Sequence, residues 1–135
     1  MAGEILKQKR MARGMAVLRI LTGLLMAYHG LEVFSKETMD MYMGWDSVKA
    51  LPAGNYMVYA GKAGELVAGI LLMLGLFTRW ASLAMAFIMF FICFFIGSGK
   101  FWYEDQHPFL FGMVALVFAI FGPGAWALDH KISKQ

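Results

Sequence analysis

The sequence predicts an all-α integral membrane protein: an antiparallel bundle of four transmembrane helices with both termini in the cytoplasm. Its 135 residues are 60% hydrophobic and 16% charged, against roughly 45–50% and about 25% in an ordinary soluble domain. A soluble chain of this size would expose large apolar patches to water, which soluble monomers avoid. Lipid is therefore the expected solvent for much of the surface, and a soluble helical bundle is the disfavoured alternative.

Four apolar segments supply the expected spans. A membrane-spanning helix needs about 20 residues, so four of them leave room for tails and loops but not for a second domain. The expected division is a basic tail at residues 1–14, a membrane domain at 15–129 and a second tail at 130–135. The spans are expected at about residues 15–34, 54–77, 80–97 and 106–122.

Each span has its own boundary signals. The first is expected to be an anchor rather than a cleaved signal peptide, because it is long, contains Arg19, and has no small-residue cleavage site after Tyr28-His29-Gly30. Only Thr78-Arg79 separates the second span from the third, which predicts a tight antiparallel hairpin there. A proline near the start of the fourth span suits a first helical turn, and Gly122-Pro123-Gly124 ends it.

The basic residues outside the spans predict the orientation. Seven lysines and arginines lie in the two tails and the short turn, and three lie in the two loops on the opposite side. The loops also carry several acidic residues. The positive-inside rule therefore places both termini in the cytoplasm, as an even number of spans requires.

Composition excludes several classes of function. The single cysteine, Cys93, lies within an apolar run, which excludes disulfide scaffolds, cysteine-based zinc sites and a dithiol pair within the chain. The net charge of +3 does not indicate a nucleic-acid partner, because the basic residues flank the spans and form no stripe along one surface. Redox chemistry would therefore need a bound cofactor or a partner protein.

Ionisable residues within the spans are the candidate site, since such residues face the bundle interior or a wet cavity by default. Lys62 and Glu65 are three residues apart and share a helix face. The stripe of Gly61, Glu65 and Gly69 is typical of closely packed membrane helices, so Glu65 is expected in a helix–helix seam. Lys62 lies roughly 12 Å below the outer surface, at a depth similar to that of His29. A structural ion pair and a proton-handling or ligand-binding site both stay open for Lys62 and Glu65.

Arg19 and His29 can line the same interior. Arg19 is expected to extend to the cytoplasmic headgroups, with an anion or cofactor contact as the alternative. Three roles stay open for His29: a core histidine, a proton donor to a quinone-like or phenolic ligand, or a metal or haem ligand.

The secondary candidates are Glu32, Glu104 and His107. These three have the ligand types of a carboxylate–histidine metal site with His29, but no spacing motif supports one and no metal is expected. The segment from Glu104 to His107 can equally be a polar helix cap.

Short motifs along the chain carry a family resemblance. In order they are Leu18-Arg19, Tyr28-His29-Gly30, Gly64-Glu65, Leu74-Gly75-Leu76-Phe77-Thr78-Arg79, His107-Pro108 and Gly122-Pro123-Gly124-Ala125-Trp126-Ala127-Leu128-Asp129. Together they resemble the DoxX family of small four-helix membrane proteins, from about Met15 to Asp129. The chain departs from the family at Gly124-Ala125-Trp126-Ala127, where members often have a basic residue, an aromatic residue and a serine. The loop at 35–53 matches no family pattern.

The resemblance implies a redox setting. The family includes proteins similar to subunits of thiosulfate:quinone oxidoreductase, others linked to quinone or catechol detoxification, and others associated with oxidative-stress enzymes at the bacterial inner membrane. It implies a multi-pass inner-membrane subunit or accessory factor, with an oxidoreductase partner subunit or as a homo-oligomer. The expected ligand is a quinone-like or other small aromatic molecule in the outer half of the bundle. Its polar lining would be Arg19, His29, Lys62 and Glu65, with His29 and Glu65 as proton relays.

Two other functions stay open. Glu65 near the membrane midplane beside a glycine-rich helix suits a small proton-coupled transporter or export helper, which would have to dimerise to enclose a pathway. A ligand-free membrane assembly factor would instead use the small-residue stripes as partner contacts. The sequence carries neither a dinucleotide fingerprint nor a thiol pair, so partnership is favoured over catalysis by this chain alone.

Overall fold

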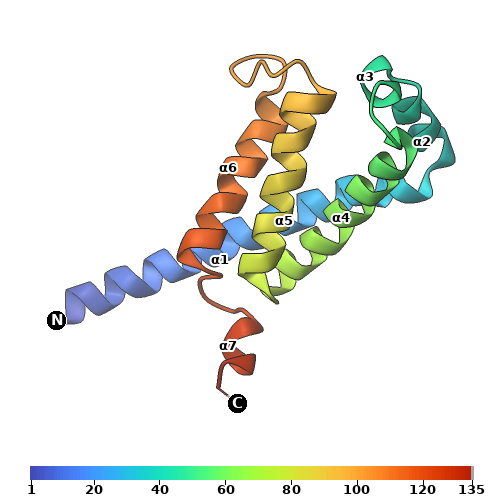
Figure 1. Cartoon of the computed structure of the whole chain (residues 1–135). Coiled ribbons are helices and arrows are strands. Elements are labelled where there is room, and N and C mark those ends of the chain that lie inside the picture. The colour runs from blue at the N-terminus through green and yellow to red at the C-terminus, as the bar shows by residue number, and fades with distance from the viewer. Residues whose placement is uncertain (135) are drawn as a thin grey trace.

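The computed structural model describes residues 1–134, and the regular elements of this part of the chain are all helices (Figure 1). The expected all-α fold is therefore confirmed. The elements in chain order are α1 (Ala2–Gly30), the 3₁₀ turn η1 (Leu31–Phe34), α2 (Lys36–Met43), α3 (Asp46–Lys49), α4 (Gly54–Leu74), α5 (Thr78–Phe91), the π-helical turn η2 (Ile92–Ile96), α6 (Gln106–Phe121) and α7 (Asp129–Ile132).

Three helical segments are long and apolar enough to cross a membrane: Ala2–Phe34, Gly54–Leu74 and Thr78–Ile96. The fourth, α6, is a shorter apolar helix. Within the apolar windows of the three long segments, only 22% to 33% of the residues are buried inside the fold. Most of their apolar side chains must therefore contact lipid, and the protein is a membrane protein.

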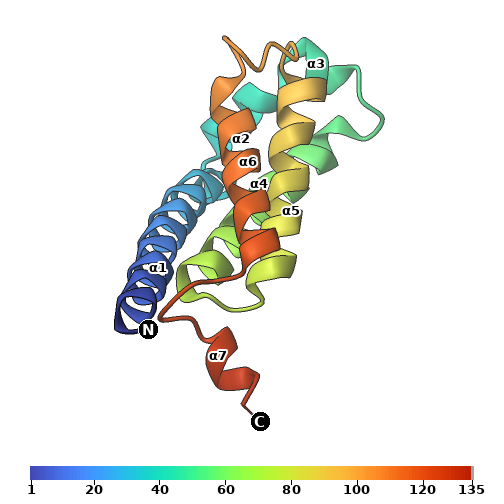
Figure 2. The same cartoon turned by 90° about the vertical axis from the view of Figure 1, so that its left-hand side faces the viewer.

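The helices run alternately in opposite directions and divide the molecule into two ends (Figures 1 and 2). The N-terminus, the α4–α5 turn and the segment after α6 lie at one end, which we call the turn end. The segments at 31–53 and 97–105 lie at the other, the loop end. Helix α1 packs against α4, α4 against α5, and α5 against α6. Because the helices pack in this series, α4 and α5 are the central pair.

The core lies between α4, α5 and α6, with Met26 added from α1. Its fully buried members include Leu72, Met85 and Phe118. The other buried members of this core are all alanine or methionine. Alanine allows close helix approach and methionine fills irregular gaps, so the helices pack closely around a few larger side chains.

Glycines let α1 and α4 approach almost backbone to backbone. A Cβ atom added to Gly23 would lie 2.6 Å from the carbonyl oxygen of Gly69, and one added to Gly30 would lie 2.6 Å from the Cβ of Leu66. Distances this short leave no room for a side chain on either helix. The α1–α4 seam therefore depends on Gly23, Gly30 and Gly69.

The structure confirms only part of the small-residue stripe predicted at Gly61, Glu65 and Gly69 on α4. Gly69 lies in the α1–α4 seam and Glu65 is buried, as expected. A Cβ on Gly61, however, would meet nothing within 4 Å, so this end of the stripe faces open space. Gly64 lies against the side chain of Ile88 on α5 instead of against α1. Helix α4 therefore packs against α1 at Gly69 and against α5 at Gly64.

The α4–α5 hairpin turns earlier than expected. Gly75 adopts the left-handed conformation (φ 68°) that commonly ends a helix, and Phe77 is also left-handed (φ 47°). Thr78 and Arg79, predicted to be the turn, are the first residues of α5. The Asp129 carboxylate accepts hydrogen bonds from the backbone N–H groups of Phe77 (2.6 Å) and Thr78 (3.0 Å). The apolar residues of the turn concealed it in the sequence.

The loop at 35–53 is ordered by short helices. Ser35 precedes α2, and its Oγ accepts a hydrogen bond from the backbone N–H of Thr38 (3.3 Å). Helices α2 and α3 pack on α4, and α3 also contacts η2. This segment therefore covers the loop end of α4 and α5.

The glycine seam predicts unequal costs for one substitution at two positions of α4. Gly69→Leu drives a side chain into the backbone of α1 and should lower stability by about 1–3 kcal/mol or more. Gly61→Leu, the matched control, enters open space and should leave the melting temperature within about 2 °C, by the scaling of stability to melting temperature. Thermal unfolding in mild detergent measures both, and equal melting temperatures would show that the seam is misplaced.

Candidate functional site

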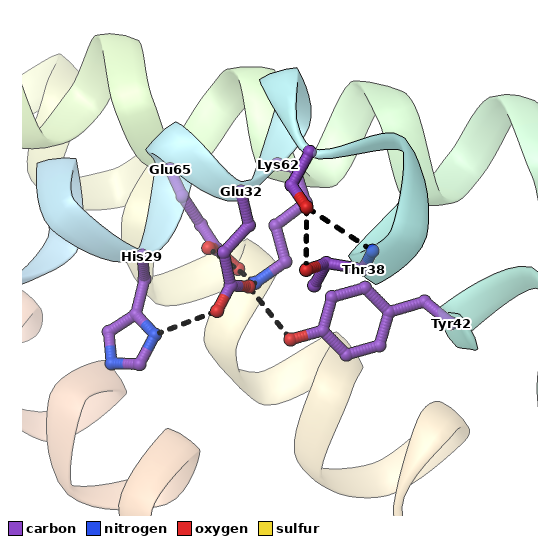
Figure 3. Close-up of polar contacts among 7 residues, drawn as sticks. His29, Glu32, Thr38, Tyr42, Lys62 and Glu65 are labelled. Carbon is purple, nitrogen blue, oxygen red and sulfur yellow. Dashed lines mark hydrogen bonds and ion pairs between the residues drawn. The ribbon is translucent and has the colours of Figure 1, made fainter. Parts of the chain in front are cut away.

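Lys62 lies at the centre of a polar cluster between α1 and α4 (Figure 3). Its Nζ atom is 2.9 Å from Oε2 of Glu32 and 3.0 Å from Oε2 of Glu65. The hydroxyl of Tyr42 donates a hydrogen bond to Oε2 of Glu32 at 2.7 Å. Lys62 also lies 4.9 Å from the centre of the Tyr42 ring, within the range of a cation–π interaction. One ammonium group therefore joins two carboxylates and one aromatic ring.

Three separate segments bring these side chains together. Lys62 and Glu65 lie one turn apart on α4, and the ion pair that their spacing allows is formed. Gly30 brings the end of α1 against Leu66, and η1 then places Glu32 beside Lys62. Helix α2, which packs on α4, adds Tyr42. The cluster thus depends on the α1–α4 seam.

Burial makes the cluster costly to break. Glu65 is 2% exposed, and a buried carboxylate without a counter-charge is strongly unfavourable. Two carboxylates share a single lysine, so the three groups carry one excess negative charge when all are ionised.

On α2, burial raises the pKa of Tyr42, as does its hydrogen bond to Glu32. Tyr42 is therefore a protonated donor at neutral pH.

Two histidines extend the cluster towards α6. His29 Nδ1 lies 4.0 Å from Oε1 of Glu32, which is too long for a hydrogen bond. The His29 ring meets the His107 ring edge-on at 5.4 Å, and His107 in turn packs on Phe111 at 4.8 Å. Within residues 1–134, neither imidazole has a hydrogen-bond partner. Their ring nitrogens are available to a bound molecule.

A cavity of about 550 Å³ lies beside the cluster. One wall is polar and consists of His29, Tyr42, Lys62, Glu65 and His107. Glu32 lies outside this lining and holds Lys62 and Tyr42 in place. The remaining lining is apolar or aromatic and includes Met26, Trp45, Met57, Phe87, Ile88 and Phe91. The volume and the mixed lining are typical of a small-molecule site.

Arg19 does not line this pocket. It is fully buried near the turn end, where its guanidinium donates hydrogen bonds to the carbonyl oxygens of Pro123, Ala125 (3.1 Å) and Trp126 (3.3 Å). The expectation that Arg19 reaches the headgroups is therefore wrong. Its partners are backbone carbonyls more than 100 positions along the chain, so Arg19 holds the C-terminal segment against the helices.

Glu104 also lies apart from the cluster. It is on the exposed loop before α6, where its carboxylate contacts Ser98 Oγ (2.8 Å) and Lys100 Nζ (3.4 Å). The neighbouring Asp105 closes this loop by accepting hydrogen bonds from the backbone of Ser98 and Lys100, and makes no side-chain cap on α6. The four residues considered as metal ligands are therefore not assembled. In residues 1–134, no group of three or more histidine, cysteine, aspartate or glutamate side chains could hold a metal ion.

Tyr42 was missed by sequence reasoning. It lies in the loop at 35–53, ten positions after Glu32, where helical periodicity does not link the two residues. The available signal was the pair Tyr42 and Trp45, whose three-residue spacing places both rings on one side, 5.0 Å apart. Both rings line the pocket.

Comparison with known proteins identifies the family. Residues 14–98 match the DoxX family model, which is more than half of the chain. The chain belongs to the DoxX family. A protein of Haemophilus influenzae described as an uncharacterized protein is 31% identical to this DoxX protein over 128 residues, covering 90% of this chain and 92% of that protein. No solved structure matches it. His29, Lys62 and Glu65 fall within the family match, and His107 lies beyond it.

Sharing of one lysine by two carboxylates predicts which substitution costs most. Lys62→Met leaves Glu32 and Glu65 without their counter-charge and should lower stability by about 3 kcal/mol or more. Glu65→Gln, the matched variant on the same helix face, keeps Lys62 paired with Glu32 and should cost less than half as much. Unfolding in detergent at neutral pH compares the two variants. Equal losses would contradict the central place of Lys62.

Proposed function

We propose that this DoxX protein is a subunit or accessory factor of a redox system in the bacterial inner membrane. It binds a quinone-like or other small aromatic molecule in the pocket beside Lys62. The observation that carries this proposal is the pocket, whose volume of about 550 Å³ falls within the roughly 300–1,000 Å³ of small-molecule sites. Its lining combines polar side chains with aromatic ones.

The pocket lining suits a ring that carries oxygen atoms. Trp45, Phe87 and Phe91 offer apolar ring faces and edges, against which an aromatic ring packs favourably. The free imidazole nitrogens of His29 and His107 can donate to or accept from a carbonyl or hydroxyl group on that ring. Recognition in this proposal combines stacking with hydrogen bonds at one edge.

Proton transfer is the proposed role of the polar wall. His29 lines the pocket and lies 4.0 Å from Glu32, whose side chain is 31% exposed. In this proposal His29 accepts the proton that the ligand releases, and a rotation of its side chain to within hydrogen-bond distance of Glu32 then passes the proton on towards the loop end. Glu65 is buried and paired with Lys62. Its proposed role is therefore to contribute to the electrostatic potential along the proton path.

Electrons require a partner in this proposal. Cys93 is the single cysteine of the chain and is buried, so it cannot form a dithiol pair within one molecule. We therefore propose that an oxidoreductase subunit, with or without a second copy of this chain, exchanges electrons with the bound ring.

The ion pair weighs against the transporter alternative. A carboxylate that cycles a proton must be able to lose its counter-charge, but Glu65 is held at 3.0 Å by Lys62. The alternative of an assembly factor without a ligand does not account for the pocket. We therefore favour the ligand-binding role over both.

We further propose that α6 spans the inner membrane together with the three long helical segments, and that both termini are cytoplasmic. The turn end contains the N-terminus, the α4–α5 turn with the start of α5, and the segment after α6 (Figure 1), and these parts carry seven of the twelve lysines and arginines. Helix α1 is about 43 Å long at 1.5 Å per residue, longer than the roughly 30 Å hydrocarbon core. Its basic first turns extend into the cytoplasm in this orientation.

Cysteine labelling tests the orientation in a Cys93→Ser background. Lys49→Cys in the segment at 35–53 should react with an impermeant maleimide added to spheroplasts, because this proposal exposes the loop end to the outside. Lys131→Cys in α7 should react only after the membrane is permeabilised. Labelling of Lys131→Cys in sealed spheroplasts would refute the orientation.

Ligand binding tests the function. The purified protein in mild detergent should bind a short-chain benzoquinone or its hydroquinone, and His107→Phe should weaken binding about tenfold because it removes one hydrogen bond and keeps the ring. His130→Phe is the matched control, since His130 contacts the Gly124 carbonyl oxygen at the turn end. Mass spectrometry of extracted small molecules gives a second measurement. The proposal fails if the wild type binds neither form and no aromatic molecule co-purifies.

A further inference from the structure

The contact between α4 and α5 ends part-way along the two helices. At Gly64 the helices touch, because a Cβ atom there would lie 2.7 Å from Cδ1 of Ile88. One turn nearer the loop end, a Cβ atom on Gly61 would meet nothing within 4 Å. Both Gly61 and Ile88 line the pocket. The pocket therefore begins where the α4–α5 contact stops, and Figure 1 shows the two helices diverging towards the loop end.

The loop end of the pocket is covered. Helix α3 contacts both α4 and η2 and so bridges the two diverging helices. Tyr42, Trp45 and Val48 from this covering segment line the pocket, and Val48 is only 1% exposed. His107 and Pro108 at the start of α6 form a further part of the lining. A direct route from the aqueous phase is therefore obstructed.

The side of the pocket between α4 and α5 is open. On α4 its edge is formed by Met57, Ala60 and Gly61, and on α5 by Phe87 and Phe91. Phe87 is 72% exposed although it lines the pocket, and Ala60 is exposed as well. These residues lie within two of the segments that can cross a membrane. What meets this edge is therefore lipid rather than water.

The two edges differ in size. Ala60 and Gly61 place almost no side chain in the opening, whereas α5 carries the rings of Phe87 and Phe91, and the ring of Phe95 in η2 stacks on Phe91. Phe87 lies 6.3 Å from Phe91, and Phe91 lies 4.9 Å from Phe95. A small-residue edge facing a row of flat rings is a slot that a hydrocarbon chain can occupy without displacing protein atoms.

We propose that the pocket opens sideways into the bilayer between α4 and α5, and that its ligand is a lipid-soluble amphiphile. The ring lies at the polar wall beside Lys62 and His107, and an apolar chain leaves past Gly61 and Phe87 into the lipid. This inference rests on the proposed function, because it assumes that the pocket binds a small aromatic molecule. It adds the chemical class of that molecule and the route by which it arrives.

Binding of two probes with one head group tests the inference. The probes are a dimethoxy-methyl-benzoquinone without a side chain and the same ring with a ten-carbon chain, each titrated into the full-length protein in lipid nanodiscs. The wild type should bind both. Gly61→Leu fills the slot and should weaken binding of the chain-bearing probe at least tenfold, while binding of the chainless ring changes less than threefold. Partitioning of each probe into lipid cancels when variants are compared with the same probe.

Gly14→Leu is the matched control, because a Cβ atom on Gly14 also meets nothing within 4 Å and Gly14 lies outside the pocket. It should leave the binding of both probes unchanged. The melting temperature of each variant verifies its fold.

The outcomes separate the inference from the proposed function. If neither probe binds to the wild type, the proposed function fails and this inference fails with it. If both probes bind and Gly61→Leu weakens both equally or neither, the sideways opening is wrong while the pocket remains a ligand site. A loss confined to the chain-bearing probe supports the opening and the amphiphilic ligand.

Discussion

The close approach of α1 to α4 is the contact on which the other features of the molecule depend. Gly30 of α1 meets Leu66 of α4 with no intervening side chain. About two helical turns away, Gly23 of α1 meets Gly69 of α4 in the same way. Only at this separation can Glu32, at the end of the α1 segment, reach Lys62 on α4. The polar cluster is therefore a consequence of backbone geometry, and a seam widened by a single methyl group would separate its charges.

The turn end uses a different means of holding the helices. The C-terminal segment bonds to α1 through the guanidinium of Arg19 and to the start of α5 through the carboxylate of Asp129. The backbone N–H of Ala125 also donates to the carbonyl oxygen of Ala12. The turn end is thus joined by polar contacts to backbone groups, whereas at the loop end α4 and α5 diverge around a pocket that α3 covers. This division explains how helices packed in series can still enclose a site.

The sequence predicted the features that depend on local spacing. Apolar runs identified the long helices, and a three-residue interval identified the pairing of Lys62 with Glu65. Features that depend on distant or backbone partners were beyond its reach. Arg19 bonds to carbonyl groups, which carry no signature in the side-chain sequence, and Tyr42 reaches Glu32 across a loop. The early hairpin turn was concealed because Leu76 and Phe77 are as apolar as the helix they follow.

The unequal number of charges around Lys62 bears on the electrical state of whatever occupies the pocket. Two carboxylates and one ammonium group lie together, so the site is already negative when both imidazoles are neutral. A further anion would be repelled where lipid and protein screen charge poorly. Under the proposed function, the pocket would therefore discriminate by ionisation as well as by shape: it would favour an uncharged phenol over its phenolate, and would stabilise a ring that gains an electron only when a proton accompanies it.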